Sequence, residues 1–166
     1  MKARYSPDFL IVGTMLAASL LALTTAWIAQ YGFGLFPCKL CLYQRLPYFG
    51  AAVLSALSLM PVVDPASRKR AVQLGAALFM TTAGIAAFHV GVEQGWWKTS
   101  CAPTGVQALS FEDIQATLQR PGAPACNDVP FTLFGVSMAG YNMIAGLILA
   151  GLALWSARKP NWWKDE

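Results

Sequence analysis

Apolar and charged positions are strongly segregated along this 166-residue chain. Asp, Glu, Lys and Arg are grouped near the ends and in the segments between four long stretches that contain none of them. These uncharged stretches cover residues 9–38, 46–63, 71–92 and 129–157. A helix that rises about 1.5 Å per residue needs about 20 residues to cross a hydrocarbon core of about 30 Å. Three of the stretches are long enough to do so.

The second stretch has only 18 residues. It becomes long enough if its helix begins near Leu42, which places Arg45 in the first turn at headgroup level, where a long cationic side chain can extend to water. We therefore expect an all-α membrane protein whose single domain is a four-helix transmembrane bundle. The predicted spans are about 9–29, 42–62, 71–92 and 132–155.

Composition agrees with a membrane protein, since 56% of the residues are hydrophobic and only 12% are charged. Four apolar helices in so short a chain would leave too little polar surface to cover a soluble fold. A cleaved signal sequence is the alternative for the first stretch, because Lys2 and Arg4 precede it. That stretch is longer than the apolar core of a signal, about 7–15 residues, and further spans follow it.

The 12 Lys and Arg residues are unevenly divided between the two ends of the predicted bundle. Eight lie at the end that carries the chain termini: Lys2, Arg4, Arg68, Lys69, Arg70, Arg158, Lys159 and Lys164. Four lie at the other end: Lys39, Arg45, Lys98 and Arg120. Because Lys and Arg in short loops stay cytoplasmic, we predict cytoplasmic termini and outer loops at about 30–41 and 93–131. The net charge of +4 then reflects orientation and contact with anionic lipid rather than nucleic-acid binding, since no basic stripe is interleaved with exposed aromatic residues.

All four cysteines fall on the predicted outer side, at Cys38, Cys41, Cys101 and Cys126. Disulfides persist in oxidising compartments such as a bacterial periplasm, so the distribution indicates two bridges or a thiol exchange system. Four cysteines allow three pairings, and the sequence does not choose among them.

The second outer loop is far longer than a usual connection, which favours a functional role. Ser110–Asp113 resembles a helix-capping box, and Phe111, Ile114 and Leu118 follow at helical spacing. This pattern predicts a short interfacial helix on the membrane surface, with a solvated helical turn as the alternative.

Cys38 and Cys41 form a CxxC motif, which occurs in zinc sites, redox centres and static bridges. Zinc usually takes four ligands from two close-set pairs. Here Cys101 and Cys126 are separated by 24 residues, and no second CxxC or HxxxH is present. We therefore expect no metal, while a purely structural pair of bridges stays open.

Neighbouring residues favour redox chemistry at the CxxC. If the second helix starts near Cys41, Arg45 stands four residues on along the same face, and the sulfur feels the positive end of the helix dipole. Two unit charges about 4 Å apart interact by about 4 kcal/mol at an effective dielectric of 20, which would lower a thiol pKa by up to about 3 units. Gln44 could donate a hydrogen bond to an acceptor bound beside the sulfur.

No soluble electron acceptor is indicated, because the chain has no GxGxxG after a strand, no P-loop and no CxxCH haem motif. The remaining acceptor is a quinone dissolved in the bilayer, which can enter between helices near Arg45. His89, near the outer end of the third span, is a candidate to line the quinone pocket or relay protons. The alternative is a histidine bonded to a neighbouring helix or to interfacial water.

These motifs together resemble the DsbB-type disulfide bond formation proteins over nearly the whole chain. The resemblance rests on Pro37–Cys41 followed by Tyr43–Arg45, on the second cysteine pair, and on the stretches Cys126–Pro130 and Phe134–Asn142 before the last span. It implies a multi-pass protein of the bacterial inner membrane with periplasmic cysteines, a protein-disulfide:quinone oxidoreductase that supports oxidative folding.

The resemblance also implies a role for each cysteine. A thioredoxin-fold oxidase of the DsbA type would attack Cys101, the released Cys126 would pair with Cys38, and Cys41 would remain as a thiolate beside the quinone, a ubiquinone or menaquinone. Arg45 would stabilise the thiolate and the developing charge on the quinone oxygen. The cycle closes when the Cys38–Cys41 and Cys101–Cys126 disulfides form again.

Two alternatives remain. A relative of vitamin K epoxide reductase would share the four spans and the quinone, but that family usually carries its CxxC near the end of a later span. A non-catalytic scaffold would use the disulfides only to brace its outer loops.

Overall fold

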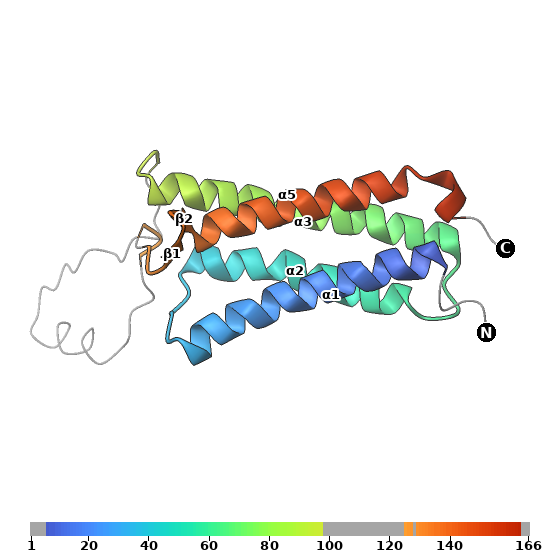
Figure 1. Ribbon diagram of the computed structural model, residues 1–166, viewed down its shortest axis with the longest axis horizontal. Helices are drawn as coiled ribbons and strands as arrows, with labels where there is room; N and C mark the ends of the chain where they lie inside the picture. Colours follow the sequence, from blue (N-terminus) through green and yellow to red (C-terminus); the bar gives the residue numbers. More distant parts are fainter. Residues whose placement is uncertain (1–5, 98–124, 128, 164–166) are drawn as a thin grey trace, which may run out of the picture.

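The computed structural model describes residues 6–97, 125–127 and 129–163, and most of them are helical. Four long helices form an elongated bundle (Figure 1). They are α1 (Pro7–Trp27), α2 (Lys39–Ser58), α3 (Pro65–Glu93) and α5 (Met138–Ala157). A π-helical turn, Ile28–Gly32, extends α1, and a 3₁₀ turn, Pro160–Trp162, follows α5. The interfacial helix predicted near 110–119 lies outside the described residues.

Three helices are long and apolar enough to cross a membrane: α1 with its π turn, α3 and α5. The chain is therefore a membrane protein by the character of its helices. α2 is not among the three, because its first two turns carry Lys39, Gln44 and Arg45. A fourth span through α2 stays a prediction.

The residues just before a helix fix where two of the helices begin. α3 starts at Pro65, before the predicted 71, because the Asp64 carboxylate accepts a 2.9 Å hydrogen bond from the backbone N–H of Ser67 and caps the helix. α5 starts at Met138 rather than near 132, because the preceding residues form a hairpin of β1 (Thr132–Leu133) and β2 (Val136–Ser137). Both residues of its two-residue loop have positive φ, as a tight hairpin turn requires.

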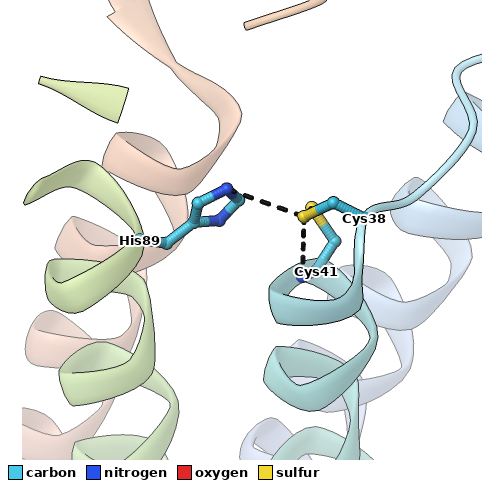
Figure 2. A group of neighbouring side chains, drawn as sticks. All are labelled: Cys38, Cys41 and His89. Carbon is cyan, nitrogen blue, oxygen red and sulfur yellow. Dashed lines mark hydrogen bonds between the residues drawn. The ribbon is translucent and has the colours of Figure 1, made fainter. Parts of the chain in front are cut away.

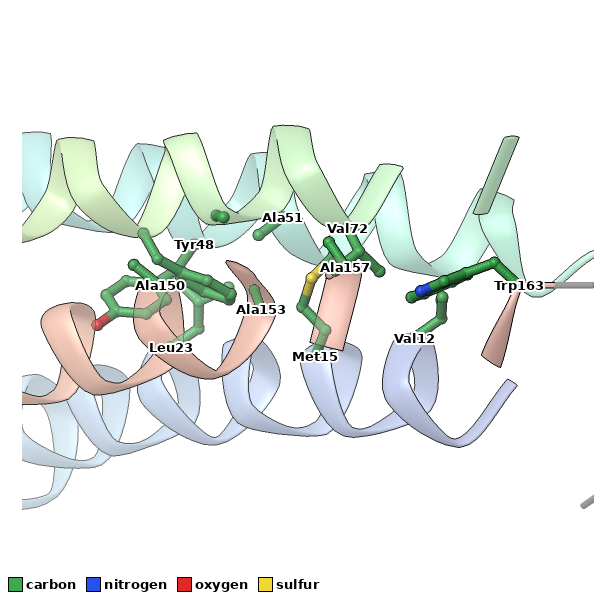
Figure 3. Close-up of a cluster of buried hydrophobic side chains, with 12 residues drawn as sticks. Val12, Met15, Leu23, Tyr48, Ala51, Val72, Ala150, Ala153, Ala157 and Trp163 are labelled. Carbon is green, nitrogen blue, oxygen red and sulfur yellow. The ribbon is translucent and has the colours of Figure 1, made fainter. Parts of the chain in front are cut away.

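Small side chains fill the interior of the bundle. α3 packs against α2 and α5, α1 packs mainly against α2, and α1 and α5 make few contacts with each other. The core is rich in alanine, and Figure 3 shows Ala51, Ala150 and Ala153 between the helices. Large side chains such as Leu21 and Leu152 lie instead on the outer surface. Small residues inside and large ones outside are typical of helices that pack closely in lipid.

A buried ion pair joins three helices at the end of the bundle opposite the cysteines. The Arg68 guanidinium donates to the Asp8 carboxylate at 2.7 Å and to the Ser58 carbonyl at 3.1 Å, and both charged side chains are buried. Loss of one partner from a buried pair costs about 3–5 kcal/mol, because the other charge is left without compensation. The pair therefore holds the start of α1 and the α2–α3 connection together.

Helices α3 and α5 approach each other closely at Gly146, and this contact gives a prediction for stability. A Cβ at this position would lie 3.0 Å from the Phe79 carbonyl oxygen and 3.0 Å from the Ala83 Cβ. We expect Gly146→Ala to destabilise the fold by about 1–3 kcal/mol, because backbone atoms of α3 cannot move aside easily. Thermal unfolding in detergent measures the effect.

Gly151→Ala is the matched control, because it lies on the same helix with no atom within 4 Å of the added Cβ. It should leave the melting temperature unchanged or raise it slightly through better helix propensity. Equal melting temperatures for the two variants would contradict the tight contact.

Candidate functional site

Cys38 and Cys41 lie at the start of α2. Their Sγ atoms are 3.1 Å apart, and the backbone N–H of Cys41 donates to the Cys38 Sγ at 3.3 Å. Both thiols are free. The Cys38–Cys41 disulfide implied by the family resemblance is therefore not formed here, and the structure shows the reduced pair (Figure 2).

α2 begins at Lys39 with Cys38 as its N-cap, two residues earlier than a start at Cys41. The positive end of the helix dipole therefore acts on the Cys38 sulfur. A hydrogen bond from the Cys41 thiol is the largest cause that lowers the pKa of Cys38 to about 4, and the His89 ring adds to it against the opposing effect of burial. The more acidic thiol is thus Cys38 and not, as the sequence suggested, Cys41.

Arg45 is directed to α1 rather than to sulfur. Its Nη1 donates to the Gln30 Oε1 at 2.7 Å, and its Nη2 donates to the Ala26 carbonyl at 3.4 Å. The direct pair with Cys41 that the helical spacing predicted is not among the hydrogen bonds of the described residues. The guanidinium nevertheless lines the same cavity as both thiols.

His89 of α3 reaches the cysteine pair from the opposite side. Its Nε2 lies 3.6 Å from the Cys38 Sγ and 3.1 Å from the Cys126 carbonyl oxygen. Its Nδ1 lies 3.0 Å from the Nε2 of Gln44 on α2. Sequence analysis named His89 and Gln44 for other reasons, but nothing in the sequence indicated that a residue 51 positions from Cys38 would touch its sulfur.

Two further residues hold Gln44 in place, and sequence analysis missed both. The Asn142 Nδ2 donates to the Gln44 Oε1 at 2.5 Å, and the Tyr48 hydroxyl donates to the Asn142 Oδ1 at 2.8 Å. In this arrangement the Gln44 amide donates to His89 Nδ1, so His89 carries its proton on Nε2, facing Cys126 and Cys38. The available signal was a lone Asn within an uncharged span, since buried amides need partners.

A cavity of about 720 Å³ opens beside the sulfur atoms. Its walls are mainly apolar side chains of α1 and α5, the two helices that make few contacts with each other. Polar groups gather at the cysteine end of the cavity: Cys38, Cys41, Gln44, Arg45, His89, Glu93 and Asn142. An apolar cavity of about 300–1,000 Å³ with a few convergent polar groups is typical of a small-molecule site.

Cys126 lies next to the CxxC pair and is buried. It is disulfide-bonded, whereas Cys38 and Cys41 are free. Cys101, its predicted partner, lies outside the described residues. Three of the four cysteines predicted as site residues therefore lie in the described part of the chain, and all three are at one end of the bundle.

The acidity of Cys38 leads to a prediction about pH. A thiol with a pKa near 8.5 loses thiolate, and with it reactivity, as the pH falls below that value. Because the pKa of Cys38 is lowered to about 4, its alkylation rate in the reduced protein should stay nearly constant from pH 8 to about pH 5. Mass spectrometry of iodoacetamide-labelled protein measures this rate.

Cys41→Ala serves as the comparison, because it removes the hydrogen bond that contributes most to the lowered pKa. As the pH is lowered, the labelling rate of Cys38 in that variant should begin to decline at a higher pH than in the unaltered protein. If the rate of the unaltered protein already declines below pH 8, as for an ordinary thiol, the assignment of Cys38 as the acidic thiol is wrong.

Comparisons with known proteins identify the family of the chain. Residues 9–156 match the family model described as Disulfide bond formation protein DsbB. The chain belongs to the DsbB family. No solved structure matches the chain.

Several similar proteins match most of the chain. Disulfide bond formation protein B of Haemophilus influenzae is 32% identical over 136 residues, which cover 78% of this chain and 75% of the relative. Disulfide bond formation protein B of Stutzerimonas stutzeri is 28% identical and covers 90% of this chain and 94% of the relative. A protein of Rickettsia prowazekii is 29% identical, covering 92% and 90%. Membership in the DsbB family makes this a membrane protein of disulfide bond formation.

Proposed function

We propose that the protein oxidises a periplasmic thioredoxin-fold oxidase of the DsbA type and passes the electrons to a membrane quinone. The observation that carries the proposal is the free Cys38–Cys41 pair, which faces an apolar cavity of about 720 Å³ together with Arg45. A cysteine pair that only braced a loop would need neither an acidic thiol nor a cavity beside it.

The cysteines carry the electrons in two exchanges. The reduced partner donates two electrons to the Cys101–Cys126 disulfide, and the partner leaves with its own disulfide formed. The released Cys126 thiolate then attacks Cys38 of the Cys38–Cys41 disulfide and frees the Cys41 sulfur; the Cys101 thiolate resolves this bridge and leaves the CxxC pair reduced. Each exchange breaks one disulfide and forms one, so thiols and electrons balance.

The position of Cys126 beside the CxxC pair supports the second exchange. Cys126 belongs to the same buried cluster as Cys38 and Val92. His89 contacts both partners of the exchange, since its Nε2 lies near the Cys38 Sγ and the Cys126 carbonyl oxygen. An N–H at this position stabilises the Cys38 thiolate that leaves when the Cys101 thiolate resolves the bridge.

Re-oxidation of the CxxC pair takes place at the cavity. A quinone bound there accepts two electrons and two protons. Arg45 supplies a fixed positive charge beside the cavity, anchored by Gln30 and Ala26 of α1. A charge held in advance costs no rearrangement when negative charge develops on a bound acceptor. DsbA has a potential near −120 mV and each 30 mV of a two-electron couple is about 1.4 kcal/mol, so the final acceptor must be more oxidising than ordinary thiol couples.

Quinone consumption by the purified protein tests the proposal. The detergent-solubilised protein is mixed anaerobically with a reduced DsbA-type partner and ubiquinone or menaquinone, and quinone absorbance and partner thiols are followed together. We expect one quinone reduced for each partner disulfide formed. A non-catalytic scaffold would consume none.

A further inference from the structure

We propose that the reduced site binds a thiophilic divalent cation, Zn²⁺ in the cell, through Cys38, Cys41 and His89. The Sγ atoms and a ring nitrogen of these residues lie within 4.8 Å of one another. Figure 2 shows the two sulfurs and the imidazole converging from α2 and α3. The site goes beyond the proposed electron transfer and does not depend on it.

The distances are close to those of a tetrahedral zinc centre. Zn–S bonds of about 2.3 Å and Zn–N bonds of about 2.0–2.1 Å place two sulfurs about 3.8 Å apart and a sulfur and nitrogen about 3.6 Å apart. The Cys38 Sγ and His89 Nε2 are already 3.6 Å apart. The two sulfurs are 3.1 Å apart and need to separate by only about 0.7 Å, which a small side-chain rotation of the half-buried Cys41 supplies.

The local charge favours a cation in this position. Both thiols lose their protons when a thiophilic cation binds, so two thiolates neutralise a divalent ion in a buried place. The Glu93 carboxylate lies 3.8 Å from the His89 Nε2 and adds further negative charge. Arg45, which would repel a cation, has its guanidinium held on α1 by Gln30.

Hydrogen bonding around His89 also suits a metal ligand. A ligating imidazole donates its other N–H to a nearby acceptor, which orients the ring. Here Nδ1 faces the Gln44 amide at 3.0 Å. When the Gln44 amide is rotated, its oxygen accepts a hydrogen bond from the His89 Nδ1–H. The hydrogen bonds that link Gln44, Asn142 and Tyr48 can then reverse their direction, because each of these side chains both donates and accepts.

Binding is confined to one redox state. A Cys38–Cys41 disulfide would remove both sulfur ligands, so only the reduced protein holds the cation. Three protein ligands leave a fourth position, and the adjoining cavity gives room for an exchangeable water there. A bound cation occupies both thiolates and thereby stops disulfide exchange at this pair until it is removed.

The sequence argument against zinc considered only the four cysteines. The third ligand comes instead from His89, on a different helix. Only the packing of α3 against α2 brings it to the CxxC pair.

Cobalt binding to the full-length protein tests the site without a partner or a quinone. Co²⁺ replaces Zn²⁺ and gives a thiolate-to-cobalt absorption band whose intensity reports the number of sulfur ligands. We use the Cys101→Ser/Cys126→Ser variant in detergent, so that Cys38 and Cys41 are its only thiols. We expect one Co²⁺ per reduced protein with two thiolate ligands, displaced by Zn²⁺, and no band after the pair is oxidised.

Substitution of the third ligand makes the test specific. His89→Leu should weaken binding by more than about tenfold, since even residues that only orient a ligand are worth about 10–100-fold. Ala87→Leu, at an exposed position of the same helix turn, should bind as the parent does. If the double-serine variant does not fold, protection of Cys38 and Cys41 from maleimide by Zn²⁺ in the unaltered protein, mapped by mass spectrometry, replaces the band.

Three outcomes would overturn the proposal: no thiolate band and no protection in the reduced protein, equal binding by the oxidised protein, or an affinity unchanged by His89→Leu. Because the assay contains no quinone and no dithiol partner, these outcomes are independent of whether the proposed electron transfer is correct.

Discussion

Cys38→Ser is expected to lower quinone-linked oxidation of a dithiol partner by at least about 10³-fold, as is usual when a covalently reacting residue is lost. Cys38 is the acidic thiol of the pair, lies 3.1 Å from the Cys41 sulfur, and belongs to the same buried cluster as Cys126. A serine hydroxyl can form no disulfide, so electrons from Cys126 have no route to Cys41. Steady-state quinone consumption with a reduced partner measures the loss.

Comparison with Cys38→Ala separates the chemistry from the fold. Cys38 caps α2 through its sulfur, and serine is a good N-cap whereas alanine is not. Both variants should be equally inactive, while Cys38→Ala alone should lose about 0.5–2 kcal/mol of stability in detergent. Activity in Cys38→Ser above about a tenth of the unaltered rate would show that the sulfur is not on the electron route.

Arg45→Met is expected to lower kcat/KM for quinone by about 10²-fold and to leave the exchange between partner and protein cysteines intact. The estimate follows from a charge-assisted hydrogen bond, worth about 1.5–3 kcal/mol, that would be lost at the cavity wall. Methionine keeps most of the side-chain volume. Single-turnover oxidation of the partner in the absence of quinone, followed by its reaction with quinone, separates the two steps.

Two other variants distinguish charge from packing. Gln30→Ala removes the 2.7 Å partner of the guanidinium but keeps the charge, so its effect should be smaller than that of Arg45→Met. Arg45→Lys keeps the charge but not the planar group that reaches both Gln30 and Ala26. Its kcat/KM for quinone should lie between those of Gln30→Ala and Arg45→Met. An unchanged kcat/KM for quinone in Arg45→Met would remove Arg45 from the acceptor site.

The pattern of apolar stretches predicted the helices of the bundle better than their ends. Long uncharged runs must be buried in lipid or protein, so α1, α3 and α5 were evident from composition alone. Their starts depended on local structure. α3 begins after the Asp64 side-chain cap, and α5 begins after a hairpin. The same limit applies to α2, whose start at Lys39 rather than near Cys41 decided which sulfur receives the helix dipole.

The sequence by itself determined the residue types and their placement along the chain: helices apolar enough for a membrane, a CxxC pair at the start of one of them, and a motif set specific to the DsbB family. These features follow from the composition of the chain and from the order of residues that are close to one another in the sequence. Only the tertiary structure decided that Arg45 binds α1, that Asn142 and Tyr48 hold Gln44, and that His89 meets the Cys38 sulfur. Contacts between helices depend on which face of each helix is turned towards its neighbour. Small residues such as Gly146 determine this packing through their shape, which no pattern in the sequence reveals.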